Sequence, residues 1–327
     1  MKKVLMSEKI DDAGINLLEK NGFSVTTSPA TDSETMKKEI ADAYAVIMRS
    51  SELPADVISA GKELRIISRN GTGINNVDVQ SATDHHILVA KVNGANAFSV
   101  AEYALTSMLM LSRKIVEDDR QVRANKDHLS EYGSMPNFSS KMGINGNELR
   151  GKTLAILGVG KIGRQLAKFA EAFEMNVIGY DPYVKDNPVK MYDKLEDIYP
   201  IADFISIHMP LTPETAGMIT KKELNVMKSN AIIINSARGG IIDENDLADA
   251  LNNDVIAGAA LDSFKPEPPE ASNPLFEAKN IIMTSHIAGT TLEANQALGE
   301  GAAQAIIDFS NGKLPEFPVN PEVFEAK

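Results

Sequence analysis

The sequence predicts an α/β protein made of two doubly wound parallel-sheet lobes with a ligand-binding cleft between them. Short apolar runs alternate with helical patterns from one end of the chain to the other, as they do in β-α-β units. A glycine-rich turn typical of dinucleotide-binding folds lies between two such runs. The length of 327 residues exceeds that of one typical hydrophobic core, so we expect two domains.

The first lobe is expected to contain five strands separated by helices. Its apolar runs are short and lie between polar turns, whereas the segments between them carry apolar residues at helical spacing. The expected strands are residues 3–6, 23–27, 45–48, 65–68 and 87–90. The expected helices are residues 13–20, 34–41, 54–60 and 77–84.

The second lobe follows a long helical pattern at residues 99–124 and a polar, loop-like segment at residues 125–147. The second β-α alternation begins at Lys152, and one amphipathic helix and a tail end the chain. The expected strands are residues 153–157, 176–180, 204–208, 231–235, 256–260 and 281–284. The final helix is expected at residues 292–311 and the tail at residues 314–327.

Residues 153–181 contain the most informative motif of the chain. An apolar run is followed by Gly158, Gly160 and Gly163 in the pattern Gly-x-Gly-x-x-Gly, then by a helical stretch and a second apolar run. Gly158 permits a tight turn, Gly160 lets a pyrophosphate approach the backbone, and Gly163 lets the helix pack on the strand. The start of that helix favours an anion, so the motif predicts a bound dinucleotide in a Rossmann lobe.

Asp181, at the end of the second apolar run, predicts which dinucleotide binds. A carboxylate there can accept hydrogen bonds from both hydroxyls of the adenosine ribose and repels a 2′-phosphate, which favours NAD over NADP. Tyr183 occupies a position where an arginine could have held such a phosphate. Asp181 could at the same time act as a turn residue before Pro182.

Composition excludes several classes of protein. The chain has 33 basic and 45 acidic residues, and a net charge of −12 argues against nonspecific nucleic-acid binding. No apolar run approaches 18 residues, so we expect no membrane span, and polar residues interrupt the N-terminal apolar stretch, which favours a first strand over a signal peptide. The absence of cysteine excludes disulfides, cysteine nucleophiles and thiolate zinc sites. We expect a cytoplasmic protein without a metal site.

Six further motifs extend over both lobes. They are GTGINNVD at residues 71–78, SVAEY at 99–103, HMPLTPET at 208–215, NSARGGIID at 235–243, LDSFKPEP at 261–268 and SHIAG at 285–289. Each is similar to a signature of the D-isomer-specific 2-hydroxyacid dehydrogenases, and the resemblance covers nearly the whole chain. Within that family the sequence most resembles the phosphoglycerate dehydrogenases of a short form, without an appended regulatory domain.

The resemblance implies a domain organisation. Residues 1–98 together with 292–327 are expected to form a flavodoxin-like substrate domain, which is discontinuous because the last helix returns to it. Residues 99–291 are expected to form the Rossmann domain that binds NAD. Relatives form two-fold dimers through the cofactor domain, so we expect a homodimer with its contact at residues 99–124 and the following segment.

The resemblance also assigns three catalytic roles. His286 exchanges the proton of the substrate hydroxyl, a task for which imidazole is suited near neutral pH. Glu267 pairs with His286 and holds its tautomer, and Arg238 grips the substrate carboxylate. Taken singly, these residues could instead be a buried imidazole, a solvated loop acid and a surface ion pair. His208 competes for the role of base, but it precedes a proline after a strand, and we expect it to line the cofactor cleft.

The cofactor contacts follow from the same motifs. Lys161 and Ile162 supply backbone N–H groups at the pyrophosphate. Asp262 can meet the nicotinamide carboxamide or can cap the end of a strand, and Met209 replaces a residue that is often polar in relatives. The expected cofactor residues are Thr72, Gly158, Gly160, Lys161, Ile162, Gly163, Asp181, His208, Met209, Ser236, Ala237, Asp262 and Gly289.

The substrate contacts are expected at strand ends of the first lobe. Arg49 and Ser50 close the third strand, Arg69 closes the fourth, and the backbone of Asn70 and Gly71 meets the substrate carboxylate. Two arginines at neighbouring strand ends could bind a distal phosphate, which implies conversion of 3-phosphoglycerate to 3-phosphohydroxypyruvate in serine biosynthesis. Ordinary salt bridging is the alternative role for either arginine.

Two departures from the family pattern leave alternatives open. Residues 91–96, KVNGAN, replace the usual Asn-x-Pro-x-x-Asn, and residues 125–147 are long for the family and could serve as a lid, a dimer contact or an insertion. The enzyme could therefore reduce another 2-keto acid, such as hydroxypyruvate, glyoxylate or a branched-chain acid. An NAD(H)-sensing protein similar to the transcriptional corepressors of this fold is a further alternative, because the motifs survive in those proteins.

Overall fold

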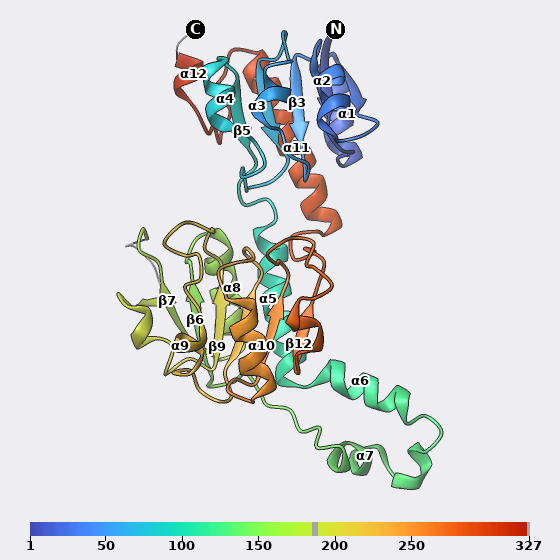
Figure 1. Cartoon of the computed structure of the whole chain (residues 1–327), viewed down its shortest axis with the longest axis vertical. Coiled ribbons are helices and arrows are strands. Elements are labelled where there is room, and N and C mark those ends of the chain that lie inside the picture. Colours follow the sequence, from blue (N-terminus) through green and yellow to red (C-terminus); the bar gives the residue numbers. More distant parts are fainter. Residues whose placement is uncertain (185–188, 326–327) are drawn as a thin grey trace. The chain divides into compact units, whose positions relative to one another are not determined.

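The computed structural model of the protein describes residues 1–184 and 189–325, and their contacts divide the chain into two compact units (Figure 1). Unit 1 consists of Met1–Asn96 and Thr290–Lys327, and unit 2 consists of Ala97–Gly289. Both units are α/β structures around a parallel sheet, as predicted. Among the described residues, none of the helices combines the length and the apolar character that a membrane span needs.

Unit 1 is built on a five-stranded parallel sheet in the order β2-β1-β3-β4-β5. This is the strand order of flavodoxin-like folds, in which the polarity of winding changes between β1 and β3. All five predicted strands are present within one residue of their expected ends. They are β1 (Lys2–Met6), β2 (Phe23–Thr27), β3 (Ala45–Met48), β4 (Ile66–Arg69) and β5 (Leu88–Lys91).

Four helices of unit 1 begin at side chains that satisfy their first amides. Asp11, Asp32, Asp78 and Thr291 each accept a hydrogen bond from an N–H group in the first turn. The helices are α1 (Asp12–Lys20), α2 (Ser33–Ile40), α3 (Ala55–Ile58), α4 (Val79–Asp84), α11 (Leu292–Ser310) and α12 (Glu322–Glu325). The α11 helix returns from the end of the chain and packs against α1 so closely that a Cβ on Gly14 would lie 2.4 Å from the carbonyl oxygen of Gly299.

The segment after α11 is more ordered than the predicted tail. It pairs antiparallel with β5: Val319 N donates to Val89 O at 2.8 Å, and Lys91 N donates to Phe317 O at 3.0 Å. The side chain of Asn320 accepts from Val89 N at 2.7 Å. A tail was expected because prolines interrupt the sequence there, but proline is compatible with the edge of a sheet. Residues 326 and 327 of the expected tail lie outside the described residues.

Unit 2 is built on a seven-stranded parallel sheet in the order β12-β11-β10-β9-β6-β7-β8. Numbered from β6, this is the Rossmann order 3-2-1-4-5-6 with one additional strand at the β12 edge. The strands are β6 (Thr153–Leu157), β7 (Asn176–Tyr180), β8 (Lys190–Met191), β9 (Phe204–Ile207), β10 (Ile232–Asn235), β11 (Gly258–Leu261) and β12 (Ile281–Met283). The six predicted strands are present, whereas the two-residue β8 was not predicted because it is too short to show a pattern.

Two predictions in the helical part of unit 2 are wrong. Residues 99–124 form two helices, because the chain turns at Lys114, whose φ of 53° lies in the left-handed region. Residues 125–147 contain two short helices, and the ring of Phe138, in the second of them, is fully buried. The helical elements are α5 (Ala97–Ser112), α6 (Ile115–Ala124), η1 (Leu129–Tyr132), α7 (Met135–Lys141), α8 (Lys161–Ala172), η2 (Leu195–Asp197), α9 (Lys221–Leu224), α10 (Glu244–Asn252) and η3 (Pro274–Glu277).

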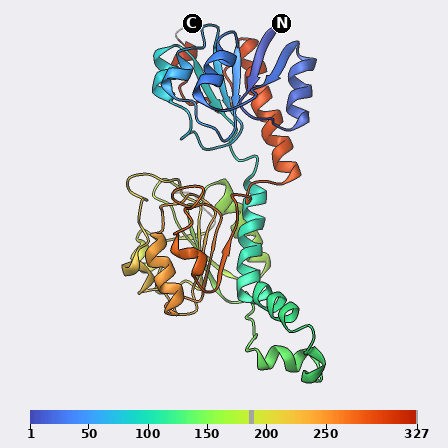
Figure 2. The ribbon, with the colours of Figure 1, turned by 45° about the vertical axis from the view of Figure 1, so that its right-hand side comes forward.

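The two helices α6 and α7 extend away from the sheet of unit 2 as an arm (Figure 2). We define the arm as residues 115–147. The α6 helix has no buried residue, and Ile115 at its start is 49% exposed. Such a helix gains little stability from packing within its own chain.

Candidate active site

The glycine motif forms the turn between β6 and α8. Each of its three positions is occupied by glycine for a different structural reason. A Cβ on Gly158, whose φ is +94°, would lie 2.7 Å from the carbonyl oxygen of His208. A Cβ on Gly163 would lie 2.4 Å from the carbonyl oxygen of Gly158, so these two glycines are required by packing. A Cβ on Gly160 would meet no atom within 4 Å. The space over Gly160 and the first turn of α8 therefore fits a pyrophosphate.

Asp181 follows β7 and ties the glycine turn to the end of that strand. Its Oδ2 accepts from Val159 N at 2.9 Å, and its Oδ1 accepts from Tyr183 N at 2.9 Å and Val184 N at 3.2 Å. The side chain thus forms the turn that was considered as its alternative role. A carboxylate can accept about four hydrogen bonds, so these three contacts leave capacity for a ribose hydroxyl. The contact with the ribose stays a prediction.

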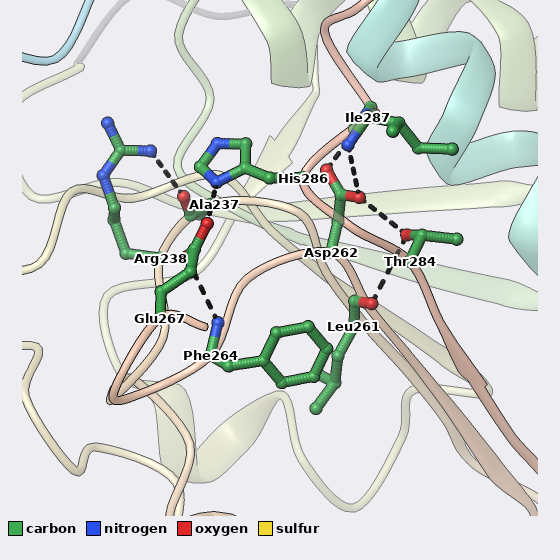
Figure 3. A network of polar contacts seen from close by, with 10 residues as sticks. Ala237, Arg238, Leu261, Asp262, Phe264, Glu267, Thr284, His286 and Ile287 are labelled. Atoms are coloured by element: carbon green, nitrogen blue, oxygen red, sulfur yellow. Dashed lines mark hydrogen bonds and ion pairs between the residues drawn. The ribbon is translucent and has the colours of Figure 1, made fainter. Parts of the chain in front are cut away.

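The three expected catalytic residues come from loops after three neighbouring strands. Arg238 follows β10, Glu267 follows β11 and His286 follows β12, and these strands lie side by side in the sheet. Because the strands are parallel, all three loops lie at the same edge, where ligands bind in α/β sheets. Figure 3 shows the three side chains near one another: Glu267 contacts His286, and Arg238 contacts Ala237 of its own loop.

Glu267 and His286 form a close pair. Glu267 Oε1 lies 2.6 Å from His286 Nδ1, and the side chains of Glu267 and His286 are 40% and 49% exposed. The second carboxylate oxygen of Glu267 faces Phe264 N at 3.5 Å. A carboxylate at Nδ1 holds a proton on that nitrogen and directs Nε2 to the other side of the ring.

His286 has an unusual backbone conformation that Asp262 supports. Its φ of 60° is left-handed, which costs a non-glycine residue about 1–2 kcal/mol. Asp262 is 1% exposed and accepts from Ile287 N and Ala288 N, both at 2.8 Å. Asp262 therefore fixes the two peptide groups that follow His286 (Figure 3). Asp262 fills the alternative role of a cap at a strand end, and its contact with a carboxamide stays a prediction.

Arg238 lies in a loop that Asn235 shapes. The Asn235 side chain donates to Arg238 O at 2.9 Å and accepts from Ala237 N at 3.1 Å. The guanidinium of Arg238 donates to Ala237 O at 2.7 Å. Asn235 begins the NSARGGIID motif, but no role was predicted for it. The hydroxyl of Ser236 is buried and has no hydrogen-bond partner in the part of the chain that the structure describes. This fits a residue whose partner is a bound polar ligand.

His208, the competing histidine, differs from His286 in its surroundings. Its Nε2 lies 2.9 Å from the hydroxyl of Ser206, and burial lowers the pKa of His208 from 6.5 to about 4. A histidine with that pKa is neutral at neutral pH and is a poor proton donor there. Met209, which follows it, is 7% exposed and packs against Gly158. These observations favour His286 as the acid–base group.

The expected substrate residues of unit 1 lie at the ends of the neighbouring strands β3 and β4. These strands are neighbours, and Asn76 connects their ends: its Nδ2 donates to Arg49 O at 3.3 Å and its Oδ1 accepts from Arg69 Nε at 3.1 Å. Arg69 Nη1 also donates to Asn70 O at 2.7 Å. Gly71 has a φ of +153°, which favours glycine, and a Cβ there would lie 2.7 Å from the flexible end of the Arg69 side chain.

Glu8 shapes the same region and was not predicted. It follows β1, and its Oε1 accepts from Ser50 N at 3.0 Å and Ser51 N at 2.9 Å. Burial opposes the charge of Glu8, but the hydrogen bonds from Ser7, Ser50 and Ser51 outweigh burial and lower the pKa of Glu8. Its negative charge is thus held by amides and hydroxyls beside Arg49. Its position directly after a strand was the available signal.

The remaining expected residues are distributed over both units. Thr72 lies in unit 1, where its hydroxyl donates to Val92 O at 3.1 Å, and its contact with a cofactor stays a prediction. Gly289 ends unit 2, just after the His286 loop. In the described ranges, no group of three or more histidine, aspartate or glutamate side chains is arranged to hold a metal ion.

Comparison with known proteins adds a family match. The sequence model of the protein family "D-isomer specific 2-hydroxyacid dehydrogenase, NAD binding domain" matches residues 105–288, more than half of the chain. The matched range contains the glycine turn, Asp181, Arg238, Glu267 and His286.

Similar proteins cover almost all of the chain. It is 38% identical over 315 residues to a D-3-phosphoglycerate dehydrogenase of Archaeoglobus fulgidus, with coverage of 95% of this chain and 58% of that protein. A D-3-phosphoglycerate dehydrogenase of Methanocaldococcus jannaschii is 37% identical over 334 residues, with coverage of 100% and 61%. The chain thus spans about three-fifths of the length of these curated relatives. The TT0316 protein of Thermus thermophilus, which has a crystal structure, is 28% identical in sequence to this chain. The two structures have a TM-score of 0.87, with coverage of 97% of this chain and 99% of that one.

The buried His208 predicts a loss of stability in mild acid. The unfolded chain binds a proton at this imidazole near pH 6.5, whereas the folded protein does so only near pH 4. The free energy of unfolding should therefore fall by about 1.4 kcal/mol per pH unit between these values, a total of about 3 kcal/mol. Urea unfolding at several pH values, with His208→Gln as the comparison, measures this term. Parallel curves for the two proteins would contradict it, even if the variant is less stable at every pH.

Proposed function

The chain belongs to the family of D-isomer-specific 2-hydroxyacid dehydrogenases, and from this premise we propose that it oxidises a D-2-hydroxy acid with NAD and catalyses the reverse reduction. The preferred pair of substrates is 3-phosphoglycerate and 3-phosphohydroxypyruvate. The names of the relatives from A. fulgidus and M. jannaschii support this choice. The observation that carries the proposal is the pair of His286 and Glu267, 2.6 Å apart, beside the Arg238 loop.

The acid–base step follows from the geometry of that pair. Bound NAD supplies the acceptor for the hydride that leaves C2 of the hydroxy acid. His286 takes the hydroxyl proton on Nε2, since Glu267 occupies the side of Nδ1 and stabilises the imidazolium that results. In the reduction, His286 returns this proton to the carbonyl oxygen.

Arg238 and the glycine turn supply binding. A guanidinium can hold the substrate carboxylate by two parallel hydrogen bonds, which also orients C2. Gly160 and the first turn of α8 receive the pyrophosphate, because the position of the missing Cβ is open. Asp181 receives the adenosine ribose and disfavours a 2′-phosphate, which favours NAD.

Arg49 and Arg69 bind the distal phosphate in this proposal. The Asn76 amide contacts the backbone of Arg49 and the guanidinium of Arg69, so it places both arginines at one edge of the sheet. Glu8 lies in the same region, and its charge is held by amides and hydroxyls of three serines. These contacts direct the carboxylate of Glu8 toward the backbone at the end of β3.

We infer that the protein forms a homodimer through the arm. A groove in unit 2 lies between the helical part of the chain and the β12 edge of the sheet. It is lined by residues of α5, α6 and the segment after α7 on one side, and by residues of η3 and β12 on the other. Ile115 of the arm is 49% exposed, and Phe276 of the groove is 52% exposed. The occupant that fits is the arm of a second copy, because a helix without buried residues gains its packing from such a contact.

The catalytic pair gives the first test of this function. His286→Ala should lower kcat by roughly three orders of magnitude, and Glu267→Gln by one to two, because each removes a group that acts on the transferred proton. The dissociation constant for NADH should change little in both. Steady-state kinetics and NADH fluorescence titration measure these quantities. Glu131→Gln is the matched control, because it breaks an exposed His128–Glu131 pair of 2.8 Å in the arm. Equal losses in Glu131→Gln and Glu267→Gln would contradict the assignment.

The arginines test the choice of substrate. Arg49→Ala and Arg69→Ala should each lower kcat/KM for 3-phosphohydroxypyruvate by about 10- to 100-fold, the effect of one charge-assisted hydrogen bond, and leave hydroxypyruvate nearly unchanged. Arg65→Ala is the control, since this exposed arginine precedes β4 at the opposite end of the strand. An unmodified enzyme that turns over both keto acids equally well would exclude the phosphorylated substrate and leave the dehydrogenase assignment intact.

Sedimentation tests the dimer. The unmodified protein should sediment as a dimer at micromolar concentration, and Ile115→Glu or Phe276→Glu should shift it toward the monomer, since a charge would be buried in the contact. Val226→Glu is the control, because Val226 is 51% exposed and lies outside the groove. An unmodified protein that sediments as a monomer would rule out the proposed contact.

A further inference from the structure

A tyrosine outside the catalytic pair is connected to the His286 loop. The hydroxyl of Tyr103, on α5, lies 2.6 Å from Thr284 Oγ1, at the end of β12. Thr284 Oγ1 lies 2.6 Å from Asp262 Oδ1. Because an ionised carboxylate can only accept, the single hydroxyl proton of Thr284 goes to Asp262. Tyr103 must therefore donate to Thr284, which gives the chain of hydrogen bonds a fixed direction.

The chain of hydrogen bonds ends at the backbone that follows His286. Asp262 Oδ1 accepts hydrogen bonds from both the Thr284 hydroxyl and Ile287 N (Figure 3). Asp262 Oδ2 accepts a hydrogen bond from Ala288 N. These contacts hold the loop in which His286 has a left-handed backbone. A conformation of this kind persists only when its surroundings enforce it. The Asp262 carboxylate thus holds the two peptide groups that directly follow His286.

The environment keeps Tyr103 protonated and able to donate. Burial raises the pKa of Tyr103, and the negative charge of Asp262 raises it further. The phenol therefore stays a hydrogen-bond donor to Thr284.

We propose that Tyr103 is a positioning residue for His286, and that it acts through Thr284 and Asp262. The phenol fixes the rotamer of the Thr284 hydroxyl. The hydroxyl in turn fixes the Asp262 carboxylate, and the carboxylate holds the Ile287 and Ala288 amides. The catalytic meaning of this inference rests on the proposed function, whereas its structural content does not.

Tyr103→Phe removes one hydroxyl and keeps the ring. It should lower kcat with 3-phosphohydroxypyruvate about five- to tenfold and change KM for NADH less than about twofold, because one hydrogen bond that orients the loop is lost. Tyr199→Phe is the matched control. Tyr199 also lies in unit 2, and its buried hydroxyl has no hydrogen-bond partner among the described residues.

A double-mutant cycle tests whether the effect passes through Thr284. Thr284→Val should lower kcat at least as much as Tyr103→Phe, and the double variant should match Thr284→Val alone. Thr284→Ser keeps the hydroxyl and should restore most of the activity. Additive losses would show that Tyr103 acts by another route, and would overturn the proposal.

Hydrogen exchange provides a measurement that does not depend on catalysis. Tyr103→Phe should speed the exchange of the Ile287 and Ala288 amides about tenfold and leave the amides of β6 unchanged, which separates the loop from global unfolding. Tyr199→Phe should change neither. Unchanged exchange at Ile287 and Ala288 in Tyr103→Phe would overturn the inference. If the unmodified protein has no dehydrogenase activity, the proposed function fails, and the exchange rates still decide the inference.

Discussion

The parallel register of neighbouring strands is the constraint on which both candidate sites depend. In unit 2 the adjacent strands β10, β11 and β12 end at one edge and deliver Arg238, Glu267 and His286 from three different loops. In unit 1 the adjacent strands β3 and β4 deliver Arg49 and Arg69 in the same way. Residues far apart in the sequence are brought together by the order and direction of the strands. Antiparallel neighbours would place successive strand ends at opposite edges of the sheet.

The polar groups at these edges are held by short hydrogen-bond networks. Asp262 is almost fully buried, and a buried charge is tolerated only when donors surround it. Its donors are a threonine and two amides of the His286 loop. Glu8 is held by serines and Asn76 by two strand ends in a similar manner. The charge of each acid thus stabilises the geometry of the loop that carries a candidate site residue.

Local sequence patterns predicted the strands well, because buried parallel strands are continuous apolar runs such as the four residues of β3. The local patterns failed where the structure depends on a contact between residues far apart in the sequence, or on an unusual backbone conformation. The helix breaks at Lys114, although no proline or glycine in the neighbouring sequence indicates a break. The helices at residues 125–147 depend on the burial of Phe138, which the local pattern does not show. The pairing of His286 with Glu267 was predicted from motifs, whereas Glu8, Asn76 and Asn235 were missed. The Glu8 contacts span 42 and 43 residues, a separation at which no local pattern operates.

The discontinuity of unit 1 affects the order in which the chain can fold during synthesis. Unit 2 is one uninterrupted stretch, so it can fold as soon as it has left the ribosome. The sheet of unit 1 leaves the ribosome first but lacks α11, whose Ala302, Ala303 and Ile306 complete its core, and lacks the segment that pairs with β5. Until residue 320 is made, one face of that sheet and the free edge of β5 stay uncovered, and such surfaces promote association between chains. Residues 1–96 are therefore made before unit 2, but they reach their final structure only after α11 and the segment beyond it have been made.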